Sequence, residues 1–181
     1  MTGLTVALRA GWSLRLAVDE DADALRQLIE TVFGEYSGCV LEPDGLDADL
    51  ASWCSYLAGL GGTGWVVTDA DDVVMACVGV APLVPDATDP RPATPGCGSV
   101  ELKRLYVAAS ARRRGLGSAL VGLVEGWAIE QGHNRVELWS DSRFADAHAL
   151  YTRIGYRPTG DERELHDISR TTELRFDRQL S

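Results

Sequence analysis

Apolar residues recur along this chain with two different periods, and each period predicts one type of element. A spacing of three or four residues marks one face of a helix. It occurs in four segments, which are 20–33, 47–60, 116–131 and 147–154. Alternation with polar residues, or a short apolar run between turn residues, marks a strand. Strands are therefore expected at 12–18, 65–68, 73–81, 99–107, 135–139, 156–159 and 169–176.

The order of these elements, β-α-α-β-β-β-α-β-α-β-β, predicts the fold class. The acidic turn 69–72 joins two strands and predicts an antiparallel hairpin, whereas the later strands are separated by helices. Both kinds of connection together predict an α/β protein with a mixed, largely antiparallel sheet of six to seven strands and about four helices on its two sides. A length of 181 residues without linkers or repeats fits one domain, residues 12–181, after a leader of residues 1–11.

Composition narrows the class of protein. Apolar residues make up 45% of the chain and charged residues 24%, as in soluble globular proteins. No apolar run approaches the roughly 18 residues of a membrane span, and the N-terminus lacks the pattern of a signal peptide. The 4 cysteines are scattered, and the spacings of the 3 histidines fit no metal site. We therefore expect a cytoplasmic protein with reduced thiols, no bound metal and no membrane contact.

Charge is spread unevenly along the chain. The net charge is −10, of which residues 1–100 contribute −11 and residues 101–181 contribute +1. An overall acidic chain disfavours nucleic acid as a partner, because binding phosphate backbones requires an extended basic surface. The asymmetry suggests one cationic and one anionic ligand, although acids that only keep the surface soluble would give the same pattern.

Segment 112–117, Arg-Arg-Arg-Gly-Leu-Gly, lies between the predicted strand 99–107 and the predicted helix 116–131. A strand that turns directly into a helix directs free backbone N–H groups, and the positive end of the helix dipole, at one spot. Such a spot binds phosphate, and the arginines add charge that pairs with it. The spacing differs from the glycine patterns of dinucleotide folds and nucleotide-hydrolysing loops. The segment therefore predicts an anion site of another kind, with a solvated basic turn as the alternative.

The spacing Arg-x-x-Gly-x-Gly at Arg112, Gly115 and Gly117 resembles the pyrophosphate motif of the GNAT superfamily of N-acetyltransferases. The predicted order of elements matches that fold, and segment 149–156 is similar to the family's Ala-x-x-Leu-Tyr-x-x-x-Gly-Phe stretch. The resemblance implies acetyl-CoA as co-substrate, with a splayed central strand whose backbone pairs with its pantetheine arm. The implied binding residues are Leu105, Tyr106, Val107, Arg112, Arg113, Arg114, Gly115, Leu116, Gly117 and Ser118.

The resemblance also implies a catalytic acid and base. Tyr151 matches the family's general acid, a hydroxyl that protonates the thiolate expelled when an amine attacks a thioester. Glu101 matches the general base of histone-acetylating relatives and would deprotonate the attacking ammonium. The alternatives are a core-facing tyrosine and a carboxylate paired with an arginine. The family's asparagine at the start of the helix is missing from 142–144, which puts that cofactor contact in doubt.

These observations predict transfer of the acetyl group from acetyl-CoA to a primary amine of a small molecule or protein, by direct attack in a ternary complex. The amine is expected to be cationic, and the 34–45 loop offers Glu35, Tyr36 and Glu42 to bind it. The loops 34–45 and 82–98 are expected to shape the acceptor pocket. A transferase of longer acyl groups, a non-catalytic acyl-CoA-binding regulatory module and a plain anion-binding domain stay open. A homodimer is possible by analogy with the family.

Overall fold

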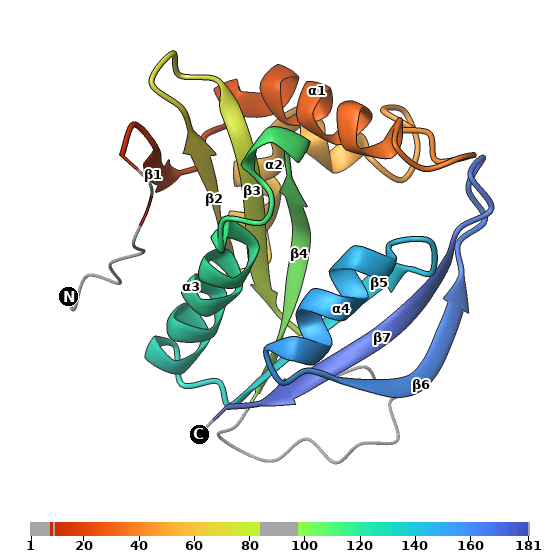
Figure 1. The fold of residues 1–181 in the computed structure, drawn as a ribbon. Coiled ribbons are helices and arrows are strands. Elements are labelled where there is room, and N and C mark those ends of the chain that lie inside the picture. The colour runs from red at the N-terminus through yellow and green to blue at the C-terminus, as the bar shows by residue number, and fades with distance from the viewer. Residues whose placement is uncertain (1–7, 9, 84–97, 181) are drawn as a thin grey trace.

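A computed structural model describes residues 8, 10–83 and 98–180, which form one sheet covered by helices (Figure 1). Most of the predicted leader 1–11 and of the predicted loop 82–98 lies outside the described residues. Within the described part, no helix has the length and apolar character needed to cross a membrane.

The observed elements follow the predicted order. The α-helices are α1 (Ala22–Phe33), α2 (Trp53–Gly59), α3 (Leu116–Glu130) and α4 (Ala145–Arg153). The strands are β1 (Ser13–Leu16), β2 (Thr63–Thr68), β3 (Val74–Pro82), β4 (Ser99–Val107), β5 (Arg135–Asp141), β6 (Arg157–Glu164) and β7 (Thr172–Gln179). Short 3₁₀ helices are η1 (Asp19–Asp21), η2 (Ala48–Ser52) and η3 (Ala109–Ala111).

The sheet has the strand order β1-β2-β3-β4-β5-β7-β6. Strands β4 and β5 are parallel, and every other neighbouring pair in this sheet is antiparallel. The predicted mixed, largely antiparallel sheet and the hairpin of β2 with β3 are thus confirmed. The parallel pair needs a crossover, which α3 supplies between β4 and β5.

Helices cover both faces of the sheet (Figure 1). Helices α1 and α2 pack on one face through residues such as Ile29, Trp53 and Leu57. Helices α3 and α4 pack on the other through Leu120, Val124 and Tyr151, among others. Side chains on a strand alternate between faces, so neighbouring residues in β2 belong to different clusters. Burial on both faces explains why the central strands read as nearly continuous apolar runs.

Strands β4 and β5 separate partway along their length. They pair only through residues 99–101 and 135–137, and β4 continues to Val107 without a partner on β5. On its other side, β4 contains an irregularity opposite β3, because Cys77 pairs with Tyr106 while Gly79 pairs with Lys103. One residue of β3 therefore faces two of β4, which is a β-bulge and bends the strand. The diverging strands leave the gap in which the candidate site lies.

Several predicted boundaries differ from the structure, and the last strand, predicted at 169–176, is observed at Thr172–Gln179. The predicted strand 156–159 is the longer β6, and the first part of the predicted helix 47–60 is the 3₁₀ helix η2. All residues of β6 are exposed, so hydrophobic alternation marks none of its length; pairing with β7 forms the strand instead. Such pairing is a tertiary effect that a local pattern does not contain.

Candidate active site

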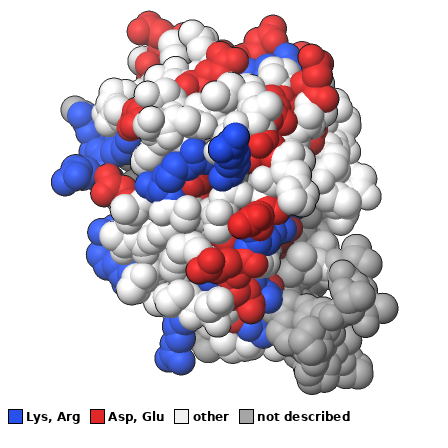
Figure 2. Space-filling model, turned by 90° about the vertical axis from the view of Figure 1, so that its right-hand side faces the viewer, with Lys and Arg blue, Asp and Glu red and all other residues white. Residues whose placement is uncertain are grey.

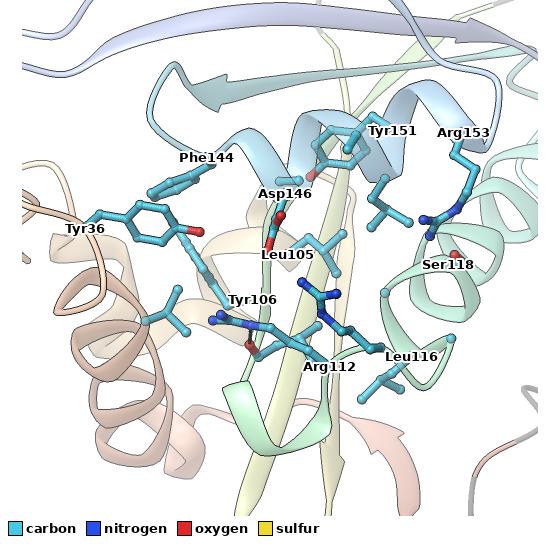
Figure 3. A pocket seen from close by; sticks show the side chains of 18 residues that line it. Tyr36, Leu105, Tyr106, Arg112, Leu116, Ser118, Phe144, Asp146, Tyr151 and Arg153 are labelled. Atoms are coloured by element: carbon cyan, nitrogen blue, oxygen red, sulfur yellow. Dashed lines mark hydrogen bonds between the residues drawn. The ribbon is translucent and has the colours of Figure 1, made fainter.

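A cavity of about 550 Å³ lies where the end of β4, the segment 112–118 and helix α4 meet (Figure 3). We call it the α3–α4 cavity. Its lining includes most of the residues predicted to bind acetyl-CoA: Leu105, Tyr106, Val107, Arg112, Arg113, Gly115, Leu116, Gly117, Ser118 and also Tyr151. The structure therefore brings the two motif-bearing segments, which lie more than 30 residues apart in the chain, to one cavity.

The backbone of 113–118 is arranged to receive an anion. Arg113 and Gly115 have φ angles of 59° and 80°, and left-handed residues in a tight turn direct successive N–H groups toward one concave spot. No described residue accepts a hydrogen bond from the N–H groups of 113–118. Helix α3 also begins without a side-chain cap or an acid in its first turn. Its N-terminus therefore keeps its positive partial charge available to a ligand.

The two glycines of the motif are required at their positions for different physical reasons. Gly115 has a φ of 80°, which a residue with a Cβ atom adopts only with strain, although a Cβ there would meet nothing within 4 Å. At Gly117, by contrast, a Cβ would lie 3.0 Å from Cδ2 of Leu150 on α4. Gly115 thus permits the turn, and Gly117 permits the close approach of α4 to the start of α3.

The three arginines of the motif point to different partners. Arg112 pairs with Glu35 and donates from Nε to the carbonyl oxygen of Val107 at 2.8 Å. Hydrogen bonding to Glu35 raises the pKa of Arg112. Arg114 lies over the ring of Trp12 at 6.0 Å and is absent from the cavity lining. Arg113, by contrast, lines the cavity and forms no salt bridge with another described residue.

Tyr151 stands on α4 with only 5% of its surface exposed. Its ring packs against Tyr156 and Phe176, with ring centroids 5.9 and 5.8 Å away, while Figure 3 shows its hydroxyl directed into the cavity. Burial raises its pKa far above the ordinary value for tyrosine. The hydroxyl is therefore protonated throughout the neutral pH range and can act as a proton donor.

Sequence reasoning missed several residues of this cavity. Phe144 and Asp146, near the start of α4, and Arg153, at its end, also line it (Figure 3). Phe144 lies against Tyr36, with ring centroids 4.6 Å apart, and so joins α4 to the segment after α1. A helical projection from Tyr151 does not suggest Arg153, because residues two positions apart lie on different sides of a helix.

A second cavity, of about 590 Å³, lies over the open face of β4, β5 and β7, and we call it the sheet-face cavity. It shares five lining residues with the α3–α4 cavity: Leu105, Tyr106, Phe144, Ala147 and Tyr151. The two cavities therefore meet across the gap between β4 and β5. A ligand in either cavity would reach the same tyrosine.

The sheet-face cavity carries more acids than bases. Seven carboxylates and four basic side chains line it, so the cavity favours a cationic ligand. The acids are Glu42, Asp47, Asp49, Glu101, Asp141, Asp167 and Glu173, and the bases are Lys103, Arg104, Arg143 and Arg163. Figure 2 looks onto the end of the molecule where the β6–β7 hairpin lies, and it shows acidic and basic side chains interleaved.

The predicted base and acceptor-binding residues are divided between the cavities. Glu101 and Glu42 line the sheet-face cavity, whereas Tyr36 lines the α3–α4 cavity, and Glu35 pairs with Arg112 beside it. Glu101 accepts a hydrogen bond from Nζ of Lys103 at 2.7 Å. Glu42 accepts from the backbone N–H of Ile168 in the β6–β7 hairpin. Of these four residues, Glu101 and Glu42 lie where an acceptor entering the sheet-face cavity would meet them.

The described residues hold no cluster of histidines, cysteines and acids that would bind a metal ion. Among the described cysteines, Cys39, Cys54 and Cys77 are free thiols. Burial raises the pKa of each, and it raises the pKa of Cys77 to about 12. These three thiols are thus held in the neutral form, which is the less nucleophilic one.

Comparison with known proteins identifies the relatives of this chain. Residues 23–156 match the sequence profile of the acetyltransferase (GNAT) family. Over 107 residues, or 59% of the chain, the sequence is 32% identical to human N-acetyltransferase 8. The matched part is 43% of that protein, so the chain spans less than half the length of this curated relative.

Solved structures share the fold at low sequence identity. An acetyltransferase of the GNAT family from Staphylococcus aureus has a TM-score of 0.74 at 18% identity, covering 94% of this chain and 99% of that one. A candidate acetyltransferase from Salmonella typhimurium, solved with its cofactor acetyl-CoA, has a TM-score of 0.67 at 17% identity over 94% and 95% of the two chains. Arabidopsis thaliana NAA60, solved with a bisubstrate analogue, has a TM-score of 0.70 at 15% identity over 94% and 99%.

Proposed function

The chain belongs to the acetyltransferase (GNAT) family, and from this premise we propose that it transfers the acetyl group of acetyl-CoA to a primary amine by direct attack in a ternary complex. The observation that carries the proposal is the meeting of two cavities at Tyr151 and Leu105. One cavity offers an open helix N-terminus and the other an excess of carboxylates. An anionic acyl donor and a cationic acceptor could therefore approach the same point from opposite sides.

The α3–α4 cavity fits the acyl donor. The unpaired N–H groups of 113–118 and the N-terminus of α3 would hold the pyrophosphate, with the side chain of Arg113 adding a positive charge. Leu105, Tyr106 and Val107 would hold the pantetheine arm through backbone groups, because this part of β4 has no partner on β5. Acetyl-CoA would supply an activated thioester at the point where the two cavities meet.

Tyr151 and Glu101 would move the protons of the reaction. Glu101 would take a proton from the incoming ammonium, directly or through water, so that the amine nitrogen can attack the acyl carbon. As the carbon–sulfur bond breaks, Tyr151 would donate its proton to the sulfur, and it would regain one as the new amide nitrogen loses its second hydrogen. A backbone N–H of Leu105 or Val107 would stabilise the charge that develops on the acyl oxygen. One proton is released overall.

Direct attack fits the described thiols better than a covalent acyl-enzyme does. Cys39 lines the sheet-face cavity, but burial and the nearby Asp141 raise the pKa of its thiol. Cys77 is completely buried. A thiol must become a thiolate to attack a thioester at a useful rate, and both environments oppose this change.

The proposal is tested by titrating acetyl-CoA into the protein in a calorimeter, followed by a thiol-release assay over a panel of amines. We expect binding, and turnover with cationic primary amines that stops when the amine is omitted. A protein that binds acetyl-CoA but turns over no amine would support the regulatory-module alternative. If the protein prefers longer acyl-CoA esters, only the acyl group named in the proposal is wrong. Absence of binding would contradict the assignment of the α3–α4 cavity.

A further inference from the structure

Arg104 occupies an unusual backbone position. It lies on β4 in the bulge opposite β3, three residues beyond the last residue of β4 that pairs with β5. Its φ angle is 53°, in the left-handed region that residues with a Cβ atom rarely adopt. A strained conformation of this kind persists only where the surroundings hold it in place.

The side chain of Arg104 is held by two carboxylates from a distant segment. Its Nε and Nη2 donate to the two oxygens of Asp49 at 3.0 and 2.5 Å, and its Nη1 donates to Asp47 at 2.8 Å. Only 16% of the Arg104 side chain is exposed. Burial works against the charged guanidinium, but Tyr106 and the two carboxylates outweigh this effect and raise the pKa of Arg104. The three side chains form what we call the Arg104 clamp.

The Arg104 clamp connects β4 to residues 47–52, which lie directly before α2. Asp49 lies in η2, and Asp47 immediately precedes it. Asp47 also accepts a hydrogen bond from the N–H of Glu42 at 2.8 Å, so it organises the segment between α1 and η2 as well. On the strand itself, the carbonyl oxygen of Arg104 accepts a hydrogen bond from the thiol of Cys77 on β3 at 3.2 Å. Both the side chain and the backbone of Arg104 are thus anchored.

This anchor lies directly before Leu105, Tyr106 and Val107. These residues lack the support of β5, so their path depends on β3 and on the bulge. They are also the residues whose backbone would hold pantetheine. A shift of about 1 Å in a group that positions a substrate can lower a rate about a hundredfold. The residue that sets the bulge is therefore placed to control how the acyl donor is bound.

We propose that Arg104, clamped by Asp47 and Asp49, is a positioning residue that sets the path of the unsupported end of β4 and thereby the binding of the acyl donor. This inference rests on the proposed function for its effect on acetyl-CoA. Its structural part, that the clamp holds residues 105–107, does not depend on any ligand.

The test compares Asp49→Asn and Arg104→Gly with the wild type. Asparagine keeps the shape of Asp49 but loses the charged pair, and glycine accepts the positive φ while removing the side chain. For both variants we expect the Kd of acetyl-CoA, measured without amine, to rise about tenfold. We expect amide hydrogen exchange of 105–107 to become faster by a similar factor in the ligand-free protein. Arg104→Lys, which keeps one charge, should recover part of both losses.

Asp21→Asn is the matched control. Asp21 accepts two hydrogen bonds from Arg15, at 2.8 and 2.7 Å, in a pair that lies away from both cavities. The Asp21→Asn substitution should lower the melting temperature without changing the Kd of acetyl-CoA or the amide hydrogen exchange of residues 105–107.

The two readouts separate the inference from the proposed function. Variants that lose only thermal stability, as the control does, would overturn the inference and leave the proposed function standing. A rise in the KM of the amine with an unchanged Kd of acetyl-CoA and unchanged exchange would also overturn it, because Arg104 would then act on the acceptor. If the wild type fails to bind acetyl-CoA, the proposed function fails, and the exchange rates alone decide whether the clamp holds the strand.

Discussion

At the scale of single residues, the surroundings of Tyr151 determine how its hydroxyl can act. The ring is buried against aromatic neighbours, and the hydroxyl reaches the point that both cavities share. Burial raises the pKa of Tyr151, so the proton stays on oxygen well above neutral pH. The same residue therefore packs as a core side chain and keeps the proton that the proposed general acid needs.

We expect Tyr151→Phe to lower kcat about a hundredfold, because a positioned acid contributes about 10²–10⁴-fold to a rate. The Kd of acetyl-CoA should change little, since the ring that packs in the core is retained. Because the pKa of Tyr151 is raised, the wild type should not lose activity through this group as the pH rises through about 10, the ordinary pKa of tyrosine. The thiol-release assay at a series of pH values measures kcat, and calorimetry measures the Kd of acetyl-CoA. An unchanged kcat would remove Tyr151 from the mechanism.

Glycines of α3 give a second prediction at this scale. Gly115→Ala should lower the free energy of unfolding by about 1–2 kcal/mol, because its φ of 80° strains any residue with a Cβ atom. It should also weaken acetyl-CoA binding, since the N–H groups would turn away from their common spot. Gly122→Ala, where a Cβ also meets nothing within 4 Å but φ is not positive, should instead stabilise α3 by about 0.5–1 kcal/mol. Denaturant unfolding of the two variants compares them; equal effects would contradict the argument.

At the scale of elements, side chains of distant segments form pairs that local patterns do not predict. Glu35 was predicted to bind the acceptor and Arg112 to bind phosphate, yet they pair with each other across 77 residues of sequence. This pair links the segment after α1 to the segment before α3. Both side chains are partly exposed, at 34% and 27%, so the pair contributes about 0–1 kcal/mol to stability.

We therefore expect Glu35→Ala to act on the acyl donor instead of the acceptor. It would release Arg112 beside the α3–α4 cavity and tighten acetyl-CoA binding by up to about fivefold, the value of one exposed ion pair. The KM of the amine should stay the same, because Glu35 does not line the sheet-face cavity. Glu30→Ala, which removes an acid from α1 that makes no contact with Arg112, controls for net charge. A raised amine KM in Glu35→Ala would restore the acceptor role.

Elements with a strong internal pattern were predicted well. The boundaries of β4 and the start of α3 agree with the sequence, because apolar spacing and glycine mark them locally. The strand β6 was predicted too short, since its exposed residues carry no alternation. The segment 48–52 has the spacing of a helix but adopts 3₁₀ geometry, and its Asp49 pairs with Arg104. Local patterns thus identify an element but not the contacts that extend or reshape it.

At the scale of the whole molecule, the separation of charge between the two cavities is the main feature. An excess of carboxylates lines the sheet-face cavity, while the start of α3 and its arginines lie on the other side of the gap. The net charge of −10 would therefore add to the attraction of the proposed cationic acceptor and oppose the approach of the anionic acyl donor, except at the α3–α4 cavity.

This arrangement predicts opposite behaviour for two kinds of amine. For a diamine with a second positive charge, raising the salt concentration from about 0.05 to 0.5 M should raise the KM severalfold, because salt screens the attraction between the diamine and the excess of carboxylates that line the sheet-face cavity. For a monoamine of equal length whose far end is a neutral hydroxyl, the KM should change little. Initial rates at saturating acetyl-CoA measure both. Equal salt responses would show that the sheet-face cavity does not select charge.

The sequence by itself determined the order of the elements, the mixed sheet and the glycine-bearing turn at the start of α3, because these depend on local apolar spacing and on glycine conformation. It also located Tyr151 on its helix. The tertiary structure alone decided where β4 separates from β5. It also decided that Arg104 pairs with Asp47 and Asp49, and that Arg112 pairs with Glu35. The physical reason is that these partners are far apart in sequence and come within contact distance only when the strands and helices have packed. A local pattern of apolar residues contains no information about such contacts.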